Sequence, residues 1–241
     1  MTRQHRCARW AVLAIALNCA VAPRATSDPP QLGPRALDSG IVINIPQRTL
    51  FLMTSGVVAG RYPVGLGRPD WPTFVGPFTV ISKEIDPVWD VPVSIQEEQR
   101  RSGKRVLTRV PPGPANPLGK YWLGLSVAGY GIHGTNAPAS ISKFQTHGCI
   151  RMLAADIEDL FTRVEVGTPG VSVYEPILIG LHQGEIWMEA HPDVYQRDRR
   201  DVLGYVTIEA ARLAPTRLLD ADLIVRVLKE RSGVPQRIDR R

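Results

Sequence analysis

The residues whose types and spacing could do chemistry lie between positions 133 and 151. Cys149 sits in the run Thr146-His147-Gly148-Cys149-Ile150-Arg151, and the polar run His133-Gly134-Thr135-Asn136 lies upstream of it. A thiol becomes a useful nucleophile when cationic or hydrogen-bonding neighbours lower its pKa from about 8.5. The two histidines and the arginine of this stretch therefore favour a nucleophilic Cys149. Gly148 would let the backbone approach a substrate closely, and amides near Cys149 would form an oxyanion hole.

Two other interpretations of the same residues stay open at this point. Cys149 could be a small buried hydrophobic residue, with His133 and His147 as polar core or loop residues. Alternatively, these three side chains could bind zinc, but His-x-Cys is an unusual spacing for zinc and no nearby Asp or Glu offers a fourth ligand. The sequence gives no other reason to expect a metal or an organic cofactor.

Residues 1–25 are typical of a signal peptide. Three arginines precede an apolar run over Trp10–Ala22, and no acidic residue occurs before Asp28. The apolar run is about a dozen residues, whereas a bilayer span takes roughly 20, so we expect export with cleavage and no membrane span afterwards. Cys19 raises the alternative of a lipoprotein, but Leu17 and Asn18 precede it where small residues are expected.

Removal of this segment changes what the composition implies. The chain of 241 residues has 29 Lys and Arg against 23 Asp and Glu, a formal charge of +6. The signal peptide holds four of the arginines, so the charge falls to +2 and little supports a nucleic-acid partner. The signal peptide also holds two of the three cysteines, which leaves Cys149 as the one thiol of an exported protein. Such a thiol is either buried and inert or kept for chemistry.

The two polar runs together resemble the signature of the L,D-transpeptidases, which have a YkuD-type catalytic domain. His133 precedes Cys149 by 16 positions, as that signature requires. Segments upstream extend the resemblance, and the whole match covers about residues 40–190. These segments are Ile41–Met53, similar to the family's opening hairpin, Tyr62–Gly67 with Thr73–Phe78, similar to "PVGxG…TPxGxF", and Pro111–Tyr121, similar to "PPGPxNPLGxY". They are most similar to the periplasmic ErfK/YbiS-type branch.

The chain departs from that branch at a few positions. Ser140 and Ser142 stand where glycines are common, and Thr73-Phe74 stands where Thr-Pro is usual. These differences bear on loop shape and substrate preference more than on the chemistry.

The resemblance implies a peptidoglycan L,D-transpeptidase of the periplasm, associated with the cell wall. Cys149 would attack the bond between meso-diaminopimelate and the terminal D-Ala of a tetrapeptide stem, and a thioester would form. An amine from a second stem, or from a lipoprotein lysine, would then take the acyl group. His133 would donate and accept the protons, with the backbone carbonyl of Gly134 orienting its ring. This reaction needs no cofactor.

Further roles are implied around the reacting pair. His147 would be an auxiliary catalytic residue. Substrate contacts would come from Arg151, Asn136, Thr146 and Gly148. The implied partners are peptidoglycan stem peptides and an outer-membrane lipoprotein as a further acyl acceptor. Two alternatives stay open, namely an L,D-carboxypeptidase or wall hydrolase that uses the same cysteine, and a non-catalytic wall-binding module.

The apolar pattern predicts an α+β fold that is mainly β, an antiparallel β-sandwich or closed sheet with a few helices. We expect a linker over 26–39, a catalytic domain over 40–176, and a hairpin with a helical extension over 177–241 that packs on the catalytic domain. Helices are predicted over 94–101, with Ser94 as N-cap, over 153–164 and near 201–213 and 218–231. The second of these would place Cys149 near a helix N-terminus.

Overall fold

The structure is a computed structural model that describes residues 29–34 and 36–240. The predicted signal peptide over 1–25, with Cys7 and Cys19, and the first residues of the predicted linker lie outside the described residues. Within the described part of the chain, no helix is long and apolar enough to span a membrane.

Eight strands form one large sheet in the spatial order β11-β9-β8-β5-β12-β1-β2-β3. The strands are β1 (Gly40–Asn44), β2 (Thr49–Thr54), β3 (Val57–Pro63), β5 (Gly76–Ile85), β8 (Tyr121–Leu125), β9 (Gly131–His133), β11 (Ile150–Arg151) and β12 (Pro169–Val173). Neighbours run antiparallel except for the pairs β1 with β12 and β9 with β11, which are parallel. Together with the four helices of the described residues, this sheet confirms the predicted α+β class.

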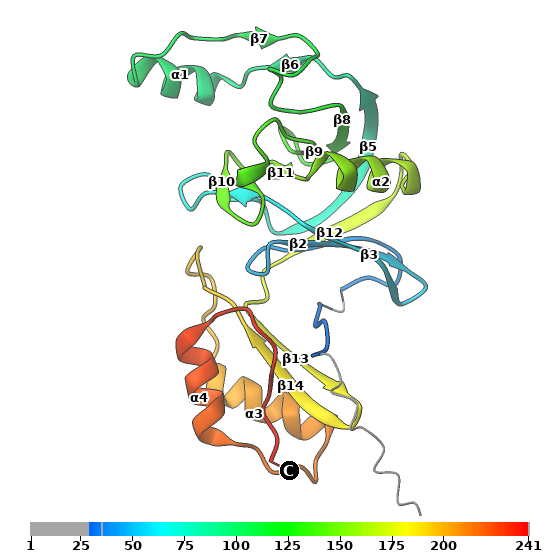
Figure 1. Cartoon of the computed structure of the whole chain (residues 1–241), viewed down its shortest axis with the longest axis vertical. Coiled ribbons are helices and arrows are strands. Elements are labelled where there is room, and N and C mark those ends of the chain that lie inside the picture. Colours follow the sequence, from blue (N-terminus) through cyan, green and yellow to red (C-terminus); the bar gives the residue numbers. More distant parts are fainter. Residues whose placement is uncertain (1–28, 35, 241) are drawn as a thin grey trace, which may run out of the picture.

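Strand β5 divides the sheet into two halves. Its first residues pair with β12, and from Val80 onward it pairs with β8, with a bulge between Val80 and Ser82. Alternate residues of β1, such as Ile41 and Ile43, point into a core shared with Ile132 of the other half, because side chains alternate along a strand. The helix α2 (Ala154–Arg163) adds further apolar side chains to this core. Figure 1 shows the two halves as layers, with α2 beside β9 and β11.

A projecting segment follows β5 in the chain. It contains β6 (Trp89–Asp90), α1 (Val93–Arg101) and β7 (Arg109–Val110), and it lies at the top of Figure 1. The predicted N-cap at Ser94 is wrong, because the helix begins at Val93 with Pro92 in the cap position and no side-chain cap. The Pro92 carbonyl accepts the first helical hydrogen bonds, and the proline ring already fixes a suitable φ of −56°. No residue of α1 is buried.

The last part of the chain has a core of its own. It comprises the hairpin β13 (Ile177–His182) and β14 (Glu185–Ala190), the helices α3 (Val202–Leu213) and α4 (Ala221–Glu230), and the short strand β15 (Gln236–Arg237). Figure 1 shows this unit, coloured yellow to red, below the large sheet.

The helices of this unit begin at aspartate N-caps and pack on the hairpin. Asp220 caps α4, so the helix begins three residues after the predicted start at Leu218, which is 73% exposed. Ile224 and Val227 form its buried face, whereas Val225 is exposed. This face packs in the core of the C-terminal unit and contacts β14.

Candidate active site

Cys149 lies in the turn between β10 (Phe144–Thr146) and β11. The parallel pairing of β11 with β9 sets Ile150 beside Ile132 and Arg151 beside His133. This register brings the two polar runs of the sequence together at one edge of the large sheet. The helix α2 begins only at Ala154, so Cys149 precedes a strand, and its expected place near a helix N-terminus is wrong.

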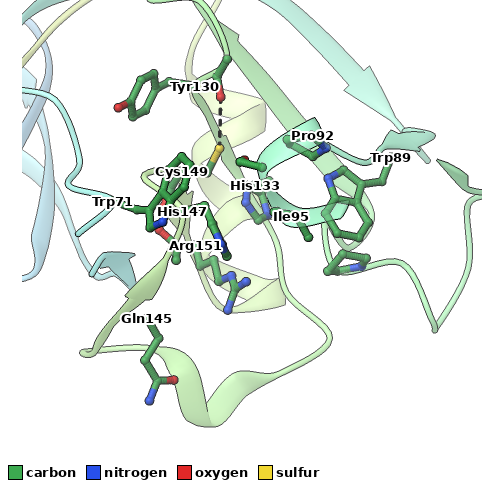
Figure 2. A pocket seen from close by; sticks show the side chains of 14 residues that line it. Trp71, Trp89, Pro92, Ile95, Tyr130, His133, Gln145, His147, Cys149 and Arg151 are labelled. Atoms are coloured by element: carbon green, nitrogen blue, oxygen red, sulfur yellow. Dashed lines mark hydrogen bonds between the residues drawn. The ribbon is translucent and has the colours of Figure 1, made fainter. Parts of the chain in front are cut away.

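A cavity of about 440 Å³ opens at this turn. Cys149, His133, His147, Thr146 and Arg151 all line it. Figure 2 shows Cys149 and His133 facing the same space, with Arg151 beside them. The remaining lining residues are mostly aromatic or apolar: Trp71, Trp89, Pro92, Ser94, Ile95, Pro117, Gly129, Tyr130 and Gln145.

His133 is a buried, neutral imidazole. Its ring Nδ1 lies 2.7 Å from the Gly134 carbonyl oxygen. A carbonyl only accepts, so Nδ1 carries the hydrogen and Nε2 keeps its lone pair. Burial, and then the charge of Arg151, lower the pKa of His133 to about 4, although backbone carbonyls oppose this. The ring also stacks on Trp122 with centroids 5.7 Å apart. A neutral histidine held in this tautomer is equipped to accept a proton.

The Cys149 thiol is protonated at rest. Its Sγ lies 3.6 Å from the carbonyl oxygen of Gly129, the contact dashed in Figure 2. Burial raises the pKa of Cys149, and this effect outweighs the backbone of Gly131 and the charge of Arg151, which both lower it. Arg151 thus acts in the expected direction, but burial keeps the pKa of the thiol above its ordinary value. A thiol in this state needs a base to become a nucleophile.

Hydrogen bonds fix the backbone of the cysteine turn. The Thr146 hydroxyl donates to the Cys149 carbonyl over 2.7 Å and accepts from the Gly148 amide over 3.0 Å. Gly148 has a φ of +106°, and an added Cβ would lie 2.7 Å from Cε1 of Tyr130. Only glycine fits both the conformation and the space. Thr146 and Gly148, predicted as substrate contacts, thus shape the turn that presents the thiol.

His147 takes part in an ion network that the sequence did not reveal. Its Nε2 lies 2.6 Å from Oε2 of Glu98 on α1. Arg68 donates two further hydrogen bonds to the Glu98 carboxylate, at 3.0 and 3.1 Å. The hydrogen bonds from Arg68 and then His147 lower the pKa of Glu98 to about 2. The sequence shows no acidic residue beside the motif, but the fold brings Glu98 to His147 from a helix 49 positions earlier in the chain.

Arg151 brings a positive charge to the cavity without an internal counter-ion. Its Nε is buried and lacks a hydrogen-bond partner, and burial lowers the pKa of the guanidinium. No carboxylate of residues 29–34 and 36–240 forms an ion pair with it. Arg151 is half-buried as a residue, and its guanidinium is available to hydrogen-bond an anion in the cavity.

Asn136, the remaining predicted substrate contact, lies apart from the cysteine cavity. Its side-chain amide donates to the Ala115 carbonyl over 3.2 Å, and it lines a separate cavity of about 290 Å³ with Asp86 and Lys120. The zinc interpretation also finds no ligand set. Among the described residues, no three His, Cys, Asp or Glu side chains are grouped to hold a metal ion.

Sequence reasoning missed the walls of the cavity. Trp71 and Trp89 lie in short loops or strands far from the motif, and Ile95 lies on α1. Tyr130 lies just before β9 and also lines the cavity. Its position three residues before His133 is the one signal in the sequence that could have indicated this.

Known proteins are similar to this chain in sequence and in structure. The family model described as YkuD, the L,D-transpeptidase catalytic domain, matches residues 38–174. "Probable L,D-transpeptidase ErfK/SrfK" of Salmonella typhimurium is 30% identical over 214 residues, 85% of this chain and 69% of that protein. "Probable L,D-transpeptidase YbiS" of Escherichia coli is 30% identical over 215 residues, 86% and 70% of the two chains. An L,D-transpeptidase structure from Mycobacterium tuberculosis H37Rv superposes with a TM-score of 0.43 at 25% identity, covering 55% of this chain and 56% of that one.

The family match contains Cys149, His133 and Arg151, and the two relatives extend the similarity over most of the remaining chain. A match over more than half of the chain and two relatives at this identity are sufficient to assign the family. The chain therefore belongs to the L,D-transpeptidases and has a YkuD-type catalytic domain.

Proposed function

We propose that this enzyme is a peptidoglycan L,D-transpeptidase with Cys149 as its nucleophile. The observation that carries the proposal is the placement of a neutral His133 and the Cys149 thiol on the walls of one cavity. Neither group is charged at rest, so a proton can pass from the thiol to the imidazole when substrate is bound.

The first half of the reaction forms a thioester. His133 Nε2 takes the thiol proton, and the thiolate attacks the carbonyl of meso-diaminopimelate in its bond to the terminal D-Ala. The C–N bond then breaks, and His133 returns the proton to the amine of the departing D-Ala. The Gly134 carbonyl stabilises the imidazolium that exists between these steps, because it accepts from Nδ1–H. No carboxylate is required for this function.

Arg151 recognises the stem peptide. A stem carboxylate would supply the counter-ion that its half-buried side chain lacks within the described residues, and could accept from the unpartnered Nε. A planar guanidinium can hold a carboxylate through two parallel hydrogen bonds, which also fixes its orientation. The carbonyl to be attacked would thereby be held against Cys149.

The second half of the reaction transfers the acyl group to an amine. The acceptor is an amine of a second stem, which gives a 3→3 cross-link, or a lysine of an outer-membrane lipoprotein. The walls formed by Trp71, Trp89 and Ile95 favour transfer over hydrolysis, because apolar walls keep water from the thioester. An assay must distinguish this transfer to an amine from two alternatives, namely carboxypeptidase activity and wall binding without catalysis.

Location and domain limits belong to the same proposal. We place the enzyme in the periplasm after removal of residues 1–25. Residues 40–176 form its catalytic domain, and residues 177–241 form the C-terminal extension. The separate core of the extension, built on the hairpin β13–β14, supports this boundary.

A covalent adduct with a carbapenem tests the nucleophile. The purified protein without residues 1–25 is incubated with imipenem, and the intact mass and the modified peptide are measured. The expected result is one adduct per chain on the peptide that contains Cys149, absent in Cys149→Ala. An adduct of equal yield in the alanine variant would refute the assignment.

A further inference from the structure

The loop over residues 67–73 carries two groups of the active site. Trp71 forms part of the cavity wall, and Arg68 binds the Glu98 carboxylate. The ends of the loop meet where the Gly67 amide donates to the Thr73 hydroxyl over 3.0 Å. The turn is tight, since an added Cβ at Gly67 would collide with the Trp71 carbonyl. The placement of this wall therefore depends on whatever keeps the loop closed.

Thr73 joins this loop to the cysteine turn. Its side-chain hydroxyl donates to the Gly148 carbonyl over 2.8 Å, and the residue is fully buried. Gly148 immediately precedes Cys149. The position of Thr73 thus bears directly on the backbone that presents the thiol.

Tyr195 reaches this point from the other end of the chain. Its hydroxyl donates to the Gly67 carbonyl over 2.5 Å and accepts from the Thr73 amide over 3.2 Å. One side chain thus ties the two ends of the loop together. Tyr195 lies beyond residue 174, outside the part of the chain that matches the catalytic-domain family.

Tyr195 is itself held rigidly. Its ring stacks on Tyr174 with centroids 5.6 Å apart and meets Phe144 edge-on at 5.7 Å. Its backbone amide donates to the Tyr174 hydroxyl over 2.8 Å, and that hydroxyl donates to Asp193 over 2.6 Å. Burial raises the pKa of Tyr195, so the hydroxyl keeps the proton that it donates to Gly67.

We propose that Tyr195 is a positioning residue of the active site. It closes the 67–73 loop and, through Thr73 and Gly148, holds Cys149 at its place in the cavity. The C-terminal extension thereby contributes to catalysis without touching substrate. The effect on activity rests on the proposed nucleophilic role of Cys149, whereas the effect on the loop does not.

The test compares Tyr195→Phe with a matched control. Phenylalanine keeps the aromatic stacking and removes only the hydroxyl, so the variant should fold. Tyr205→Phe makes the same change on α3, in the same extension but away from the loop. The second-order rate of acylation by imipenem should fall about tenfold in Tyr195→Phe and stay within twofold of wild type in Tyr205→Phe.

Two further readouts separate positioning from a general loss of structure. The far-UV circular dichroism spectrum and the melting temperature should stay close to those of the wild type in Tyr195→Phe, because the aromatic ring still packs on Tyr174 and Phe144. Hydrogen exchange should speed up in peptides covering 66–74 and 144–150, and stay unchanged over α3 and α4. Failure of imipenem to acylate the wild type would refute the role of Cys149. It would leave the hydrogen bonds of Tyr195 to the loop untouched, and the exchange measurement would still test them.

Three results would overturn the inference. The first is that both peptides of Tyr195→Phe exchange hydrogen at the wild-type rate. The second is wild-type acylation despite faster exchange, which would show that the tie does not position Cys149. The third is an equal loss of acylation in Tyr205→Phe.

Discussion

His147 Nε2 lies 2.6 Å from Glu98 Oε2, although 49 positions separate the two residues in the chain. This contact joins the cysteine turn to α1, a helix with no buried residue of its own. Arg68 completes the link from the 67–73 loop. Three segments that surround the cavity are therefore held together by one carboxylate.

Replacing Glu98 by glutamine should loosen α1 at the cavity mouth. The amide cannot accept charge-assisted hydrogen bonds from both partners, so we expect kcat/KM for thioester formation to fall roughly tenfold. Trypsin should also cut faster within 100–105, at the C-terminal end of α1 and just beyond it. Limited proteolysis and stopped-flow acylation measure the two effects.

Glu97→Gln is the matched control for that change. Glu97 is the exposed neighbour on the same helix and should show neither effect. Equal results for the two variants would mean that the Glu98 network does not hold α1.

The pH dependence of the reaction should reflect the lowered pKa of His133. The pKa of His133 is lowered to about 4 by burial and by Arg151, so the ring stays a competent base well below pH 6.5. We expect the acid limb of the kcat/KM profile near pH 4. An acid limb near 6.5 that disappears in a folded His133→Gln variant would contradict the burial argument.

Folding stability should respond to the same titration. Between pH 4 and about 6.5, the unfolded histidine binds a proton that the folded one excludes. Stability therefore rises with pH across this window, by up to about 3 kcal/mol from this group. Urea denaturation at several pH values, compared between wild type and His133→Gln, isolates that contribution.

Replacing Arg151 by methionine should separate stability from substrate binding. The Nε of Arg151 is buried without a hydrogen-bond partner and the side chain has no counter-ion within the described residues, so a neutral side chain of similar length should leave Tm unchanged or raise it. The rate of thioester formation with a stem peptide should fall about 10- to 100-fold. With a stem peptide whose carboxylates are amidated, the wild type should already form the thioester slowly. The rate with this peptide should change little in the variant. Equal losses for both peptides would exclude carboxylate recognition by Arg151.

An alanine at Gly148 should displace the nucleophile. The left-handed φ of +106° and the contact with Tyr130 both oppose a Cβ, and together they should cost about 2 to 4 kcal/mol. Gly167→Ala is the control, because Gly167 has a φ of +97° with nothing near its added Cβ. The difference between the two free energies of unfolding isolates the contact. If the two variants were equally stable, steric conflict with Tyr130 would have no part in shaping the turn.

The sequence predicted the motif residues but not what surrounds them. His133 and Cys149 belong to short runs with recognisable spacing, and alternating residues such as Ile41 and Ile43 reveal their strand directly. Glu98 and Tyr195 could not be predicted, because they meet the site through contacts between distant segments.

Local patterns also misplaced the starts of two helices. Ser94 has the side chain of an N-cap, but the carbonyl of Pro92 begins α1. Leu218 begins an apolar helical pattern, but Asp220 caps α4, which starts at Ala221. In both places, the residue whose carbonyl accepts the first helical hydrogen bond differs from the predicted one.

The central claim is that Cys149 transfers the acyl group of a stem peptide to an amine. The direct measurement is incubation of wild type and Cys149→Ala with a disaccharide-tetrapeptide, followed by mass spectrometry of the products. The account predicts loss of D-Ala and a 3→3 dimer with the wild type, and no product with the variant. A tripeptide without dimer would indicate hydrolysis, and equal processing by Cys149→Ala would contradict the account.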